Sequence, residues 1–151
     1  TVVSKDGAGL TTTASYYIIR MVTDRTQDDV DALNDRGTYN ASDLNRVNTA
    51  MAYLNGWLSD AGYVTGYVGQ GIAWAIDDIP LQAQMADYLS NVGAIGGTFS
   101  LANAPALPAS MELLTHEGAN HIERVLVLTD QIRARLKRSP FMSGEIFCGE
   151  V

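Results

Sequence analysis

The stretch from Asn40 to Leu58 constrains the fold most, because its apolar residues recur at steps of three and four. This spacing places them on one face of an α-helix. Asn40 is a predicted N-cap, and Asp43 adds a negative charge near the positive end of the helix dipole. An amphipathic helix must bury its apolar face, so we expect other helices to pack against this one. The face consists of Leu44, Val47, Met51, Leu54 and Leu58.

Three further segments carry helix signals. Thr26 is a predicted cap for a short helix that runs to about Asp35 and stops near Gly37. Pro80 suits the first turn of a second helix, which Gly93, Gly96 and Gly97 end. Thr115 caps the longest helix, with Glu117 in its first turn and Pro140 as its stop. The predicted inward faces are Leu81, Met85, Tyr88, Leu89 and Val92 in the second helix, and Ile122, Val125, Leu126, Ile132 and Leu136 in the longest.

Both ends of the chain have strand-like composition. The segment 11–22 is rich in β-branched and aromatic residues, and the tail after Pro140 alternates in part. We therefore predict a mainly α fold: a compact four-helix domain (24–139), with short flanking β-strands in an N-terminal arm (1–23) and a C-terminal extended tail (140–151). Such strands must pair within the chain or with another chain. The expected interface residues are Tyr16, Tyr17, Ile18, Ile19, Ile146 and Phe147.

Composition excludes several classes of protein. The chain has 151 residues, of which 46% are hydrophobic and 18% charged, a balance typical of one globular domain. Its net charge of −7 disfavours binding to nucleic acid, which Lys and Arg drive. No apolar run approaches the roughly 20 residues that span a bilayer. Cys148 is the only cysteine, so no internal disulfide can form. A start at Thr1, without a leader, suggests a processed product or a fragment.

The two clearest helices share a short internal pattern. Leu44-Asn45-Arg46-Val47-Asn48 and Ala119-Asn120-His121-Ile122-Glu123 match in residue type, each at the same distance after a capping residue. Two helices built alike can pack as a pseudo-symmetric pair. Asn45 and Asn120 then occupy equivalent places, where each amide is expected to bond to the backbone of a neighbouring loop. Contact of the two amides with a ligand is the alternative.

No reaction chemistry stands out. His116 and His121 have a spacing of five, whereas a helical zinc pair needs four, so we predict no metal site. Asp77 and Asp78 form an acidic pair, but no base or nucleophile can be tied to them, and we interpret them as helix-start acids. The glycine-rich stretch GYVGQGIA lacks the GK[ST] ending of a phosphate loop. We predict no catalytic residues and no cofactor.

Two clusters remain open between a structural and a binding role. Basic residues crowd the end of the longest helix, at Arg133, Arg135, Lys137 and Arg138. They favour helix capping and solubility, with a patch for an acidic partner as the alternative. Aromatic residues around the glycine-rich stretch favour packing, with a sugar-binding platform as the alternative. That platform would need Tyr63, Tyr67 and Trp74 to be exposed together.

Three segments carry a family pattern: VTDRTQDDVDALNDRG with YNASDLNRVNTAMAYL; WAIDDIPLQAQMADYLSNVGAI; and LPASMELLTHEGANHIERVLVLTDQI with SGEIFCGE. Together they resemble a family of minor structural (tail-associated) proteins of phages and prophages of Gram-positive gut bacteria. The likeness covers roughly residues 22 to 150. Its motifs are structural in character, and the residues that we select from them are Asn40, Asp43, Asn45, Trp74, Asp78, Pro80, Glu117 and Asn120.

The resemblance implies a virion component of a tail, baseplate or fibre, made in the host bacterial cytoplasm. It implies other phage structural proteins as partners and a homo-oligomer, either a ring or a trimer, because tail parts are symmetric. A receptor- or glycan-binding tip that touches the host surface is the alternative. A peptidoglycan-cutting enzyme is a third hypothesis, which requires a second carboxylate beside Asp77 or Asp78.

Overall fold

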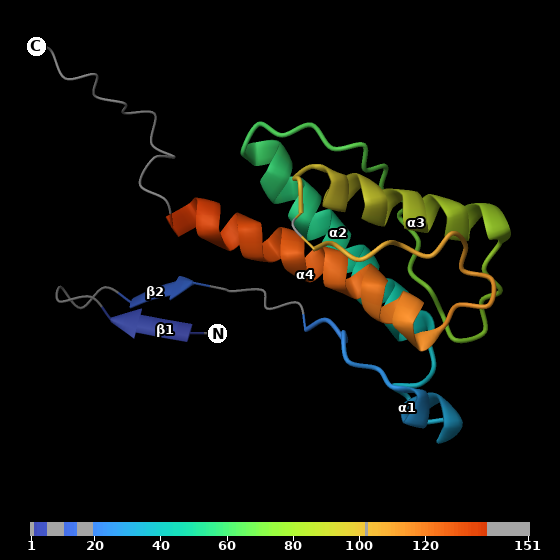
Figure 1. Cartoon of the computed structure of the whole chain (residues 1–151). Helices are drawn as coiled ribbons and strands as arrows, with labels where there is room; N and C mark the ends of the chain where they lie inside the picture. The colour runs from blue at the N-terminus through green and yellow to red at the C-terminus, as the bar shows by residue number, and fades with distance from the viewer. Residues whose placement is uncertain (1, 6–10, 15–19, 102, 139–151) are drawn as a thin grey trace, which may run out of the picture.

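The structure, a computed structural model, describes residues 2–5, 11–14, 20–101 and 103–138. This part of the chain is mainly helical, as the sequence predicts, and contains four helices. Figure 1 shows the three longer helices side by side, with the short one below them. The elements are β1 (Val2–Lys5), β2 (Thr11–Ala14), α1 (Gln27–Asp31), α2 (Ala41–Asp60), α3 (Gln82–Gly97) and α4 (His116–Arg138).

The three long helices all run in the same direction, with their N-terminal ends together (Figure 1). Two contacts between α2 and α4 show this: Arg46 binds Glu123 near both starts, and Tyr53 lies under Arg133 farther along. Parallel neighbours cannot be joined by a short turn. The loops 61–81 and 98–115 therefore run back along the bundle. Val68 in the first loop contacts Asn91 of α3, and Gln70 contacts Gln84 nearer the start of that helix.

Local capping fixes where the first two helices begin. The side chain of Thr26 accepts from the backbone N–H of Asp29 at 3.2 Å, and Asp29 accepts in return from Thr26 N–H. Asn40 and Asp43 form the same reciprocal box at the start of α2. Such boxes satisfy N–H groups that have no partner inside the helix. The predicted caps Thr26 and Asn40 are confirmed, although α1 ends at Asp31, before the expected Asp35.

The core lies between α2, α3 and α4. All five predicted face residues of α2 are buried, as are Tyr88, Leu89 and Val92 of α3. Burying a side chain of this size contributes roughly 1.5–3 kcal/mol each. In α4, Ile132 and Leu136 are only half-buried, because that end of the helix has fewer neighbours. Completely covered side chains are Val47, Leu58, Tyr88, Val92, Ile95 and Ile122, each with 0% exposure.

The start and the end of α3 differ from the prediction. Pro80 lies before the helix, whose N-cap is Leu81 and whose first residue is Gln82. Leu81 is 64% exposed and takes no part in the apolar face, because the helix places it outside its first turn. Gly93 and Gly96 do not end α3. A Cβ at Gly96 would lie 2.3 Å from Val125 Cγ1, so the absence of a side chain lets α4 approach closely.

The predicted flanking strands are not confirmed. β1 and β2 pair antiparallel, with Val2 opposite Ala14, and β2 covers only the first part of the strand expected over 11–22. Residues 20–26 form no strand. The C-terminal strand, the stop at Pro140 and all six expected interface residues lie outside the described part of the chain: Tyr16, Tyr17, Ile18, Ile19, Ile146 and Phe147.

Candidate functional site

Four charged side chains meet between α2, α4 and the segment before α1. We call Arg25, Asp43, Arg46 and Glu123 the charged cluster. Arg25 Nη2 donates to Asp43 Oδ1 at 2.9 Å and to Glu123 Oε1 at 2.7 Å. Its Nη1 donates to the carbonyl of Val22 at 2.7 Å. Arg25 is 4% exposed and Glu123 0%, so these bonds form away from water.

The second arginine completes the cluster. Arg46 Nη2 donates to Glu123 Oε1 at 2.7 Å and also binds Asp43. Burial lowers the pKa of Arg46, but its bonds to Glu123 and Asp43 outweigh burial and raise it. Two cations face two carboxylates, so the buried charge is balanced. Isolated buried charges are very costly, and the pairing of opposite charges is what lets such a cluster persist, although Arg25 Nε is buried without a hydrogen-bond partner.

Three asparagines each hold the backbone of one residue in another segment. Asn45 accepts from Trp74 N–H and donates to Trp74 C=O, both at 2.8 Å. Asn120 does the same to Arg25, at 3.0 and 2.9 Å. These are the contacts that the shared helix pattern predicts for Asn45 and Asn120. Asn91 makes the third pair, with Val68, at 2.8 and 2.9 Å. Each amide pairs with the backbone as a neighbouring strand would, so the loop 61–81 and the segment before α1 are held without a sheet.

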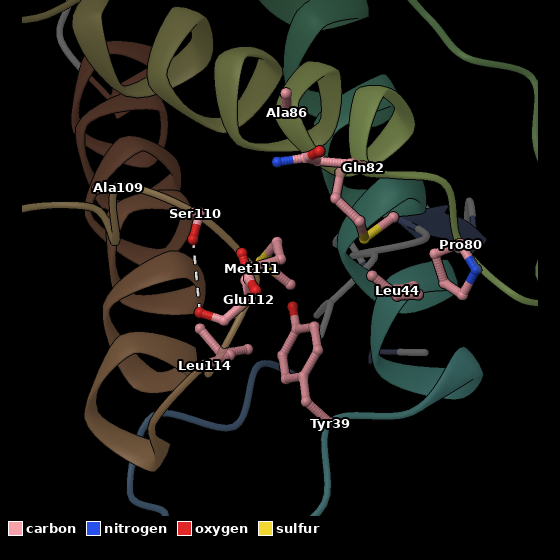
Figure 2. Close-up of a pocket in the computed structure, with 11 residues that line it drawn as sticks. Tyr39, Leu44, Pro80, Gln82, Ala86, Ala109, Ser110, Met111, Glu112 and Leu114 are labelled. Carbon is pink, nitrogen blue, oxygen red and sulfur yellow. Dashed lines mark hydrogen bonds between the residues drawn. The ribbon is translucent and has the colours of Figure 1, made fainter.

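An open cleft of about 750 Å³ lies where the three long helices begin. Figure 2 shows Tyr39 and Leu44 on one side of it, Gln82 and Ala86 above, and the segment before α4 opposite. Its lining is mostly apolar, which is the usual character of a binding site. The lining residues are Tyr39, Leu44, Pro80, Gln82, Met85, Ala86, Ala109, Ser110, Met111, Glu112 and Leu114.

A pair of tyrosines connects this cleft to the charged cluster. The hydroxyls of Tyr39 and Tyr88 lie 2.6 Å apart, and the Arg25 guanidinium lies 5.3 Å from the centre of the Tyr39 ring. Burial raises the pKa of Tyr39 well above its usual value. It also raises that of Tyr88, to which the nearby Tyr39 adds. Both phenols therefore stay protonated and act as a neutral hydrogen-bonded pair.

The remaining motif residues have structural contacts. Contrary to the prediction, Asp78 does not start a helix. It closes the turn 75–78 by accepting from Ala75 N–H at 2.7 Å. Asp77 beside it is exposed. Thr115 caps α4 by accepting from Gly118 N–H at 3.1 Å, and Glu117 is exposed in the first turn, as predicted.

The structure shows the surroundings of the aromatic residues near the glycine-rich stretch and of the basic residues at the end of α4. Trp74 is 7% exposed, so it cannot share an exposed platform with Tyr63 and Tyr67. The glycine-rich stretch forms a loop, in which Tyr63 packs edge-on against Phe99. At the end of α4, Arg133 is buried against Tyr53 and binds Asp130, whereas Arg135 and Lys137 are exposed. His121 Nδ1 lies 3.0 Å from the carbonyl of Ala106.

Two important residues, Asn91 and Arg25, are not among those that the sequence patterns identify. Asn91 has a signal, since it is a polar residue within the apolar face of a predicted helix. Glu123 belongs to the shared helix pattern, and it follows Ala119 at a helical step of four on the inward side. Arg25 has no such signal. Its partner Glu123 is separated from it by 98 positions, and only the folded chain brings them together.

No group of three or more His, Cys, Asp or Glu side chains within the described residues is placed to hold a metal ion. None of the described helices combines the length and the apolar character that crossing a bilayer requires. No protein-family model, curated protein or solved structure matches this chain.

Proposed function

We propose that this chain is a structural virion component of a phage tail, baseplate or fibre, which acts through protein–protein contacts and carries out no reaction. The proposal rests on the resemblance of its three helix motifs to tail-associated structural proteins. It also rests on one observation: the polar motif residues other than the exposed Glu117 bind other parts of the same chain. Asp43, Arg46 and Glu123 bind one another, and Asn45 and Asn120 hold loops.

This observation explains why such a motif would define a family. A catalytic motif presents its polar atoms to a substrate, whereas these atoms are occupied in holding the helices, the loop 61–81 and the segment before α1 in place. Helices fixed in this way form a rigid spacer, which suits a part that transmits position within an assembly. Its partners are then other tail proteins and further copies of the same chain.

Labelling of particles tests the assignment. Antibodies against the purified chain are expected to decorate one place on the tails of particles from bacteria that encode it, as seen by electron microscopy. Peptides of the chain should also co-sediment with intact particles through a density gradient. A chain that is found only in the soluble fraction of the lysate, and never with particles, would contradict a virion role.

Two assays separate the other function classes. Binding of the fluorescently labelled chain to host cell walls, with competition by free glycans, would favour a receptor-binding tip. A zymogram on peptidoglycan with analysis of released muropeptides tests for cleavage. Under our proposal, both assays give the background of an unrelated acidic helical protein.

A further inference from the structure

The two loops that border the cleft carry acidic residues and no basic ones. Residues 47–123 contain no Lys and no Arg, and they supply both loops that border the cleft. Four acids in those loops and in the first turn of α4 are exposed. We call the cleft, together with residues 76–82 and 110–117 on its rim, the cleft end. The acids there are Asp77, Asp78, Glu112 and Glu117.

Large apolar side chains also point into water at the cleft end. Ile79 is 87% exposed, Leu81 64% and Leu113 92%. Leu113 has a φ of 57°, a left-handed conformation that is unfavourable for a non-glycine residue. Clustered exposed apolar residues beside an apolar cleft are typical of an interaction surface. The surface therefore suits a partner that is apolar and positively charged.

The opposite end of the molecule has that chemistry. After Asp130, α4 contains only basic, polar and apolar residues up to Arg138, and we call residues 131–138 the α4 tip. Arg135 and Lys137 on the tip are exposed, and Ile132 and Leu136 are only half-covered. Figure 1 shows the tip extending beyond the ends of α2 and α3.

From this complementarity we infer that copies of the chain associate head to tail, the α4 tip of one copy docking on the cleft end of the next. Because the three long helices run in the same direction, the cleft end and the α4 tip lie at opposite ends of the molecule. The tip of one copy therefore cannot dock on the cleft end of the same copy. A contact of this kind uses two different surfaces, and it builds a ring or an open chain. The inference deepens the proposed function by naming a partner and the surfaces that it uses.

Two surface variants test it. The cleft variant, Leu81→Asn with Leu113→Asn, removes exposed apolar side chains. Asparagine suits both positions, because it is a good N-cap and tolerates a positive φ. The tip variant, Arg135→Glu with Lys137→Glu, reverses two exposed charges. Matched controls are Val68→Asn, an exposed apolar position away from the cleft, and Arg124→Glu, an exposed charge earlier on α4.

Sedimentation velocity and light scattering of the full chain provide the readout. The wild type and both controls should form oligomers that grow with protein concentration and weaken at high salt, because salt screens exposed charges. Each surface variant alone should be monomeric. An equimolar mixture of the two variants should form a 1:1 dimer and nothing larger, since each variant keeps one intact surface.

Three results would overturn the inference. They are a wild type that stays monomeric throughout, a surface variant that associates as the wild type does, and a mixture that stays monomeric when each variant alone has lost association. The last would show that an intact tip and an intact cleft end are not enough to form the contact. Because the assay uses purified chain, these results reject the interface alone, whereas absence from particles rejects the virion role alone.

Discussion

At the scale of single residues, the fold depends on polar side chains that replace secondary structure. Asn45, Asn91 and Asn120 each satisfy both backbone groups of one loop residue, which leaves those groups no need of a sheet. The sequence pattern predicts two of the three, because Asn45 and Asn120 occupy equivalent places in similar helices. The helical periodicity predicts the buried apolar residues well, because the residues on the apolar face of a helix are the ones that pack into the core.

Replacement of Asn91 tests this role. Asn91→Ala removes both bonds to Val68 and leaves two backbone groups unsatisfied, so we expect the free energy of unfolding to fall by about 1–3 kcal/mol. Urea denaturation measures the loss, and hydrogen exchange should show faster exchange at the Val68 amide. Asn48→Ala on α2 is the control, with a smaller effect. Unchanged exchange at Val68 would contradict the role.

The tyrosine pair predicts a loss of stability in alkali. Burial raises the folded-state pKa of Tyr39 and Tyr88 above the ordinary value of 10.0. The unfolded chain therefore releases protons first as the pH rises, so stability is complete below pH 10 and falls above it. Denaturation across this range should show a shallower fall for Tyr39→Phe with Tyr88→Phe. The control Tyr63→Phe should lose stability with pH as steeply as the wild type. If stability falls equally in the wild type and both variants, the tyrosine pair does not cause the loss.

At the scale of elements, sequence predicts the existence of the helices better than their limits or direction. Periodicity and caps identify the helices because both are local properties. Gly93 and Gly96 predict a helix end that the structure does not have. At Gly96 the helix contains glycine because α4 comes close there. The parallel arrangement is not local at all. It follows from which loop each helix holds, and loops 61–81 and 98–115 carry no periodic signal.

The contact between α3 and α4 can be tested at Gly96. Gly96→Ala places a methyl group against Val125, and overpacking of this kind typically costs about 1–3 kcal/mol. The double variant Gly96→Ala with Val125→Ala should recover much of the loss. At Gly56 in α2 a Cβ meets nothing within 4 Å, so Gly56→Ala should stabilise by roughly 0.5–1 kcal/mol. Thermal and urea unfolding compare the three, and equal effects at both glycines would argue against close packing.

At the scale of the whole molecule, the charged cluster joins three segments that are distant in sequence. Sequence patterns identify Asp43 and Glu123 as motif residues, but they do not indicate that Arg25 completes the set. A residue in an irregular segment has no periodicity to reveal its direction, and its partners are found only through the tertiary fold. The same limit applies to the cleft, whose walls come from the starts of α2 and α3 and from the segment before α4.

Neutralising one carboxylate should destabilise the entire domain. Glu123→Gln leaves Arg25 and Arg46 with Asp43 alone, and an uncompensated buried charge typically costs about 3–5 kcal/mol. Chemical denaturation should show this loss as one cooperative transition. Glu117→Gln, the exposed acid on the same helix, should change stability by less than about 0.5 kcal/mol. Similar losses at the two positions would show that the cluster is not what holds the segments.

The common direction of the long helices has a consequence for folding kinetics. Adjacent antiparallel helices can meet as soon as a short turn forms, but here each helix meets the next only after a loop has crossed back. The contact of Arg46 with Glu123 closes 77 positions of chain. Contacts between remote positions slow the search for the native state, so we expect this domain to fold more slowly than a helical bundle of the same size whose helices are joined by short turns.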